Sequence, residues 1–323
     1  MRRLAFLATA VLAVSAAPAA RAEQLDLDLT RLGAPDPAVW TTIIAPLGGT
    51  PAQAQTYATQ SRQRFALLSS QMAMALSSAM LQPASTTGYS GFAVDLEVAS
   101  AGVKIDPVGV ATAGFGASAW PTASTNPSSL LIPSLHVRKA LPYSFEVGGR
   151  ILWVNSSNYA AVQGEAKWAV NEGFDYVPDV AVRAAFTRLL GVRDWNLSST
   201  DLDILLSMRL ASRGVVSFTP YLAARFTYVN SSTSAMDFAP CHGGGATCTL
   251  GASPQDIAST QAAFPTFKQA FYRTTLGLRF TTYSVSMAVE GTYFGGAAVS
   301  SGDYSDVNVS STLSFAGKLG WEF

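Results

Sequence analysis

The side chains that could perform acid–base or nucleophilic chemistry are few, and they include only two histidines, His136 and His242. A hydrolytic site pairs a histidine with a nucleophile and an orienting carboxylate. His242 has no obvious orienting acid near it in the sequence. His136 lies near the short-turn end of the alternating stretch 131–138, away from the end where a site is expected, so we expect it to pair with a carboxylate. We therefore predict no catalytic residue, no cofactor and no enzyme activity.

A pair of acids offers a second kind of chemistry. Asp201 and Asp203 are two residues apart, so on a strand they share one face and could bind a cation or position a water. Ion pairing with Arg183 or Arg225 is the simpler expectation, because buried carboxylates usually have a cationic partner.

The first residues indicate export. Arg2 and Arg3 precede the apolar run 4–17, and small residues end the stretch at Ala22. This pattern predicts a signal peptide over residues 1–22, cleaved before Glu23. The apolar run is shorter than the ~20 residues that a membrane-spanning helix needs.

An exported chain can also form disulfides. Cys241 and Cys248 are separated by six residues in a glycine-rich stretch, which predicts a small loop closed by a disulfide. Zinc is the alternative for these two cysteines and His242, but a fourth ligand is not evident. We therefore predict no metal site.

Charge and composition narrow the class of protein. Cleavage removes three arginines, which leaves 18 basic and 21 acidic side chains, a net charge of −3. A nucleic-acid-binding protein would show a basic patch, so we expect no nucleic-acid partner. Charged residues make up 13% of the chain, against about 25% in soluble domains. The deficit suits a protein whose outer surface does not face water.

From Gly88 onwards, about ten segments alternate apolar and polar residues, as in the closing segment 306–323. A period of two predicts β-strands. Segments of ten or more residues exceed the five to six of soluble sheets and match the ~9–11 of a tilted membrane strand. We predict a transmembrane antiparallel up-and-down β-barrel of about ten strands (range 8–12) over residues 88–323, with apolar side chains facing lipid.

The charged side chains of these strands should then line the lumen. They are Asp95, Glu97, His136, Arg138, Glu146, Arg150, Glu165, Lys167, Asp179, Arg183, Asp201, Asp203, Arg209, Arg225, Arg273, Arg279, Glu290, Lys318 and Glu322. Acids and bases balance, whereas a selective pore usually has a ring of one sign. The balance predicts ion-pair networks that brace a narrow interior.

Three further features refine the barrel. Connections after even-numbered strands are short, and the two longest, 100–126 and 231–265, follow odd-numbered strands. Aromatic residues at both strand ends predict two interfacial belts, with Phe294 in the belt near the long loops. Proline removes a ladder donor, so we expect a bulge or a strand end at Pro133, Pro178 and Pro220.

The segment 23–87 has a different character. Phe65, Leu68, Met72 and Leu76 recur at helical spacing within a predicted helix over 51–81. This N-terminal helical segment is predicted to plug the barrel mouth, to cap the periplasmic side or to lie on the membrane, and the sequence does not choose among these positions.

These patterns resemble the outer-membrane β-barrel proteins of Gram-negative bacteria, over residues 88–323 and the signal peptide. Leu319, Trp321 and Phe323 are similar to the C-terminal signal by which such proteins are recognised for assembly. The resemblance implies an outer-membrane location. It also implies lipid, lipopolysaccharide and the barrel-assembly machinery as partners. We expect a monomer.

For function, we predict a narrow passive channel or an envelope-structural protein with a charge-balanced lumen. One alternative is a surface-binding or adhesion barrel that acts through its long extracellular loops. Another is an uptake barrel for apolar solutes with a helical plug. The residues of the sequence do not distinguish among these functions.

Overall fold

The computed structural model describes residues 25–104, 108, 120, 127–174, 176–213, 216–239, 260–299, 302–304 and 307–323. The predicted signal peptide lies outside the described residues, and so do Cys241, His242 and Cys248. The predicted cleavage and the predicted disulfide therefore stay predictions.

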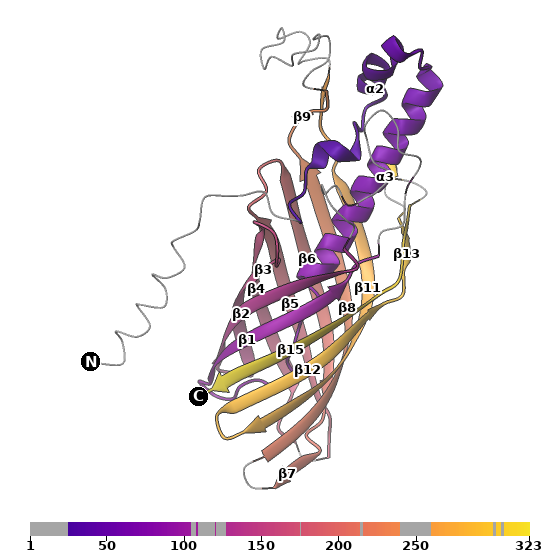
Figure 1. The fold of residues 1–323 in the computed structure, drawn as a ribbon. Coiled ribbons are helices and arrows are strands. Elements are labelled where there is room, and N and C mark those ends of the chain that lie inside the picture. Colours follow the sequence, from indigo (N-terminus) through magenta and orange to yellow (C-terminus); the bar gives the residue numbers. More distant parts are fainter. Residues whose placement is uncertain are drawn as a thin grey trace, which may run out of the picture.

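Ten long antiparallel strands form a closed ring (Figure 1). They are β1 (Phe92–Gly102), β2 (Ser129–Leu141), β3 (Phe145–Trp153), β4 (Ala160–Asn171), β5 (Asp179–Leu190), β6 (Trp195–Ser207), β8 (Val216–Thr233), β11 (Phe267–Thr282), β12 (Val285–Phe294) and β15 (Thr312–Glu322). Each pairs with the next, and the pairing of β1 with β15 closes the ring. The predicted antiparallel barrel of about ten strands is confirmed.

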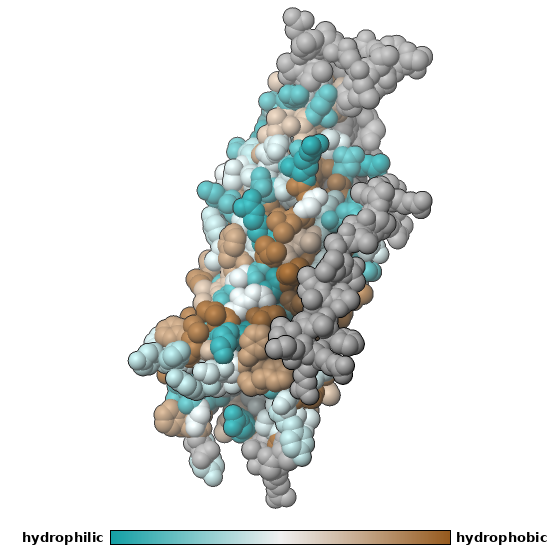
Figure 2. Space-filling model, turned by 90° about the vertical axis from the view of Figure 1, so that its left-hand side faces the viewer, coloured by the Kyte–Doolittle hydropathy of each residue, from teal (hydrophilic) through white to brown (hydrophobic). Residues whose placement is uncertain are grey.

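The alternation of the sequence decides which side chains face outwards. Leu96, Ile204 and Leu276 lie 55–64% exposed on the outer wall, while their neighbours along the strands are buried inside. Figure 2 shows hydrophobic residues frequent over the middle and lower wall and hydrophilic ones towards the upper end. Such an apolar outer surface with a polar interior is typical of a barrel that spans a membrane.

Aromatic side chains lie at both ends of the outer wall. Phe145 and Trp168 stack near the short turns, with ring centroids 5.8 Å apart. Phe226 and Tyr272 pack at 5.3 Å nearer the long loops. The prediction for Phe294 is wrong: Tyr293 takes the outward position, so Phe294 points inwards and is 2% exposed.

The two rims differ in the length of their connections. At one rim, β11 and β12 are joined by Tyr283 and Ser284 alone, and the short strand β7 (Ala211–Arg213) lies beside β8. The other rim carries the connections 103–128, 234–266 and 295–311. Outer-membrane barrels have short periplasmic turns and longer extracellular loops. We therefore call these the periplasmic rim and the outer rim.

The outer rim continues above the barrel as a set of short strands and connections, which we call the outer extension. The short strand β9 (Met236–Asp237) pairs with β10 (Gln261–Ala262), and β13 (Ala297–Val299) pairs with β14 (Val307–Val309), with the 3-10 helix η4 (Gly302–Tyr304) between the latter two. The predicted closing strand is therefore divided into β14 and β15. Val307 and Val309 are buried within the outer extension instead of facing lipid.

The N-terminal segment folds as the 3-10 helix η2 (Leu29–Leu32), α2 (Pro37–Ile44), the 3-10 helix η3 (Ala45–Leu47) and α3 (Pro51–Leu76). Thr50 caps α3 in a capping box with Gln53, and proline takes the first helical position. The helix ends five residues before the predicted Leu81. No helix in the described part of the chain is long and apolar enough to cross a membrane.

Two of the three predicted strand irregularities are absent. Both β2 and β8 run through their prolines without a shift in register. The pairing of β2 with β3 ends at Ser134, next to Pro133, and the pairing of β8 with β6 ends at Tyr221, next to Pro220. The N–H group that each proline lacks therefore falls where the pairing with one neighbouring strand ends. Pro178 lies directly before β5. The register shift that does occur lies between Ala169 and Asn171.

The last residue takes part in barrel closure, which gives a first prediction. The Phe323 N–H donates to the Phe92 carbonyl at 2.8 Å, and the Phe92 N–H donates back at 3.0 Å. Deleting Phe323 should lower the fraction of folded barrel in the outer membrane, measured by heat-modifiable mobility on gels. Leu47→Ala is the control, because Leu47 is equally exposed, at 75%, but lies outside the barrel. Equal assembly of the two variants would contradict the role of the terminus.

Candidate functional site: the occupied lumen

The C-terminal part of helix α3 lies in the outer half of the lumen, and its start lies above the barrel (Figure 1). Every residue from Arg64 to Leu76 is buried, on all faces of the helix, and Figure 1 shows α3 descending into the barrel from the outer rim. Ser69 contacts the wall through its hydroxyl, 2.8 Å from that of Ser231. Arg64 donates to the carbonyls of Leu32 and Val108, and burial lowers the pKa of its guanidinium. The C-terminal part of α3 is therefore enclosed by the barrel wall.

Below α3, residues 77–91 cross the rest of the lumen without helix or strand before β1 begins at the periplasmic rim. We call these residues the threaded segment. The backbone at the helix end is held by arginines of the wall. Arg225 donates to the Ser77 carbonyl at 2.5 Å, and Arg273 donates to the Met74 carbonyl at 3.1 Å. These carbonyls lack partners within the helix, and the negative end of its dipole favours a cation.

The backbone of residues 79–81 is bound by a cation and by an anion of the wall. Arg150 donates to the Ala79 carbonyl at 2.6 Å. Glu290 accepts from the backbone N–H groups of Met80 and Leu81, each at 2.6 Å. Charged side chains of the wall thus replace the hydrogen bonds that a helix or a strand would have supplied to this segment.

The lower part of the segment follows the same pattern. Lys167 donates to the Ser85 carbonyl at 3.0 Å. Glu172 accepts from the Thr86 N–H at 2.7 Å, and Glu146 accepts from the Thr87 N–H at 2.9 Å. Wall side chains therefore bind the segment from the helix end to the periplasmic rim.

The same wall side chains also pair with one another. Asp95 lies 2.9 Å from Arg138 and 3.1 Å from Lys318. Glu146 links Arg138 to Lys167, at 3.2 and 2.9 Å. The charged side chains of the lumen are therefore engaged both in ion pairs and in hydrogen bonds to the backbone of the segment.

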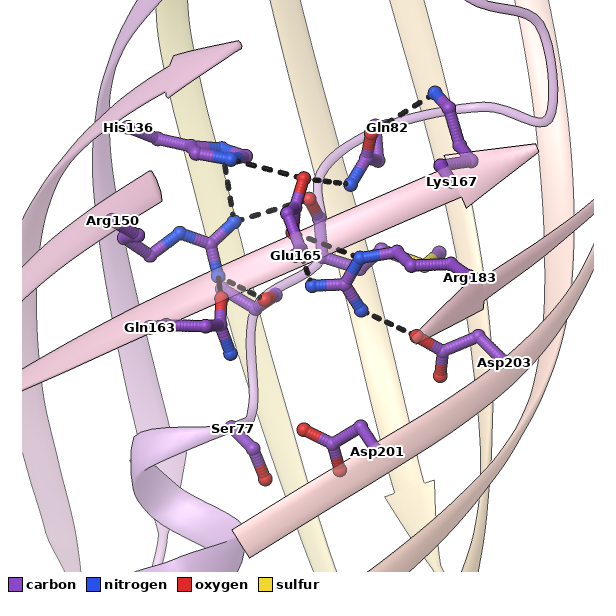
Figure 3. Close-up of polar contacts among 12 residues, drawn as sticks. Ser77, Gln82, His136, Arg150, Gln163, Glu165, Lys167, Arg183, Asp201 and Asp203 are labelled. Atoms are coloured by element: carbon purple, nitrogen blue, oxygen red, sulfur yellow. Dashed lines mark hydrogen bonds and ion pairs between the residues drawn. The ribbon is translucent and has the colours of Figure 1, made fainter. Parts of the chain in front are cut away.

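Glu165 is the centre of this network (Figure 3). Its carboxylate lies 2.5 Å from the Arg183 guanidinium and accepts from Gln82 of the threaded segment at 2.8 Å. The ring of His136 bridges two carboxylates, with Nδ1 3.0 Å from Glu97 and Nε2 3.1 Å from Glu165. Arg183 continues the chain by pairing with Asp203.

The structure places the predicted lumen residues as follows. All of them are buried except Arg209, which is exposed at the periplasmic rim, and Glu322, which is partly exposed. Asp201 and Asp203 do not act together on one ligand: Asp201 pairs with Arg273, and Asp203 with Arg183 and Arg225. Sequence reasoning missed Gln82 and Glu172. The predicted plug concerned the helix over 51–81, and no pattern in the sequence assigns a wall contact to Gln82 or to Glu172 in the turn after β4.

One group in the described part of the chain has the residue types of a metal site: ligand atoms of Asp95, Glu97 and His136 lie within 4.8 Å of one another. Each acid already faces a cation, Asp95 through Arg138 and Glu97 through Arg150 at 2.8 Å. A metal ion would have to compete with these fixed guanidinium charges. The group therefore does not fit a metal site.

No protein-family model and no curated sequence matches this chain. Solved structures similar to it are outer-membrane barrels. Ail, the attachment invasion locus protein of Yersinia pestis, is 10% identical, covers 73% of this chain with all of its own, and has a TM-score of 0.28. The N-terminal barrel domain of Pseudomonas aeruginosa OprF is 9% identical over 72% of this chain and 97% of its own, with a TM-score of 0.28. The translocator domain of autotransporter NalP from Neisseria meningitidis is 10% identical over 73% and 89%, with a TM-score of 0.35. The likeness concerns the fold alone.

The network predicts a large difference between two arginines of β5. Arg183→Ala should destabilise the barrel by about 3–5 kcal/mol, because it leaves the buried carboxylates of Glu165 and Asp203 without their shared cation. Arg188, on the outer face of the same strand, is exposed, so Arg188→Ala should change stability by no more than about 0.5 kcal/mol. Urea unfolding in detergent measures both. Similar stabilities would show that the network does not hold the fold.

Proposed function

We propose that this protein is a closed outer-membrane barrel that displays its N-terminal segment and outer loops for binding at the cell surface. The observation that carries this proposal is the occupied lumen. The C-terminal part of helix α3 lies in the outer half, and wall side chains bind the backbone of residues 77–87 below it. A barrel of this kind anchors a surface without conducting solutes through it.

The attachment of the first described residues supports display at the outer rim. The Leu25 N–H donates to the Ser156 carbonyl at 3.0 Å, and Asp26 accepts from the Asn158 side chain at 2.8 Å. The Tyr159 hydroxyl donates to the Leu27 carbonyl at 3.2 Å, and burial raises the pKa of this hydroxyl to about 12, so it keeps its proton. The chain therefore enters the lumen from the outer side.

Aromatic packing makes the outer extension a fixed surface. Phe65 of α3 stacks on Phe264 with ring centroids 4.4 Å apart, and Phe238 packs edge-on against the same ring at 6.0 Å. Tyr304 packs against Phe267 at 5.3 Å. A preorganised surface loses less conformational entropy on binding than a loose loop, which favours binding over a lid that opens and closes.

The passive channel is the competing function, and electrical recording separates the two. Purified protein in planar bilayers should show no conductance steps, because α3 and the threaded segment leave the lumen full. A variant without residues 25–84 should conduct if it folds, which its heat-modifiable mobility checks. Stable steps from the full chain would overturn the closed lumen, whatever the truncated variant does.

Display at the surface is tested by epitope insertion at Gly48. This glycine has a φ of +79° in the turn between η3 and α3, and a side chain there would meet nothing within 4 Å. An antibody should label the inserted epitope on intact cells. The matched control is the same epitope at Tyr143, 89% exposed in the β2–β3 turn, which should be labelled only after permeabilisation. The reverse pattern would contradict the proposed orientation.

A further inference from the structure

The periplasmic end of the lumen contains a polar cavity of about 360 Å³. It lies between the threaded segment and the inner face of β8 and β11, where Thr219 pairs in register with Arg279, and Ser217 with Thr281. The alternating residues Phe218 and Phe280 of the same strands take the opposite face, so the cavity lies on the lumenal side of the wall and not on the lipid side. Six hydroxyl side chains line it: Ser85, Thr86, Thr87, Ser217, Thr219 and Thr281.

Two guanidinium groups also line the cavity. Arg279 is 9% exposed and donates to Glu322 through one terminal nitrogen, but its buried Nε has no hydrogen-bond partner in the structure. Arg209 is exposed and has no ion-pair partner among the described residues. Glu322 is the one carboxylate of the lining itself, against these two guanidinium groups. The carboxylates of Glu172 and Glu146 lie behind the lining, bound to Thr86 and Thr87.

One hydroxyl donor of the lining is also unused. The Thr87 hydroxyl is buried without a partner, although its backbone N–H is bound by Glu146. The cavity therefore combines the Arg209 guanidinium and the unpartnered Nε of Arg279 with hydroxyl groups. Such a set of donors matches the oxygens of a phosphate group, which accepts several hydrogen bonds and prefers arginine for its planar, forked geometry.

We propose that this cavity binds a phosphate group presented from the periplasmic side. Arg209 and Arg279 supply the charge, and the hydroxyls of Thr87, Ser217, Thr219 and Thr281 complete the coordination. The Thr86 hydroxyl takes no part, because it already donates to Glu172 at 3.0 Å. The group comes either from a free phosphate or phosphomonoester, or from a phospholipid headgroup that bends over the rim. The proposal goes beyond the surface-binding function and does not depend on it, because the cavity lies at the opposite end of the barrel.

Calorimetric titration of the detergent-purified full chain with inorganic phosphate and with glycerol 3-phosphate, in phosphate-free buffer, tests the proposal. Native mass spectrometry with phosphatidic acid is the lipid arm. Arg209→Ala should weaken binding at least tenfold, because Arg209 lies outside the strand ladders and its loss leaves the barrel intact. Arg188→Ala is the matched control, since it removes an exposed arginine at the outer end of β5 and should leave binding unchanged. Thr281→Val gives a second, uncharged test and should also weaken binding.

Each outcome decides the proposal. Binding of a soluble phosphate that is lost in Arg209→Ala and kept in Arg188→Ala supports a free phosphate. Binding of phosphatidic acid alone, with the same dependence on Arg209, supports the headgroup. Lack of binding to all three probes, or equal affinities in wild-type protein, Arg209→Ala and Arg188→Ala, would overturn the cavity as a phosphate site.

Discussion

The backbone of residues 77–87 must find hydrogen-bond partners inside a barrel, and the rest of the structure depends on meeting that requirement. The segment is neither helix nor strand, so it cannot satisfy its own N–H and C=O groups, and leaving them unpaired in a buried place costs about 1–3 kcal/mol each. The wall supplies the partners: arginines and a lysine for the carbonyls, glutamates for the N–H groups. Irregular backbone at membrane depth is tolerated when protein surrounds it in this way.

This requirement also explains why the lumenal charges balance. A peptide backbone offers donors and acceptors in equal numbers, so a wall that binds it needs both cations and anions. A permeating ion would instead favour one sign. Glu165 illustrates the arrangement, because one carboxylate pairs with Arg183 and also accepts from Gln82 of the segment. The charged side chains of the wall therefore bind the segment and also pair with one another.

The barrel could be predicted from the sequence because its signal is local. Alternation along each strand needs only the strand's own residues, and it gave the strand count, the outward apolar face and the parity of the loops. The prediction was wrong at Phe294, which points inwards while its neighbour Tyr293 faces out. It was also wrong at Val307, which packs inside the outer extension instead of facing lipid. The contacts of the site could not be predicted, because Glu290 and Met80 are 210 residues apart and no pattern links them. The helix end at Leu76, and not Leu81, has the same origin: wall arginines bind the carbonyls of Met74 and Ser77 and so stabilise an earlier end.

The position of the segment constrains how the barrel can close. Its two ends lie at opposite rims, α2 and the start of α3 above the barrel and β1 at the periplasmic rim. Entry after closure would require two helices to pass through a lumen that one of them already fills. Because β1 follows the segment directly and pairs with β15, a wall that closes around a chain already in place avoids this passage. The seam between β1 and β15 thus both completes the sheet and encloses the segment.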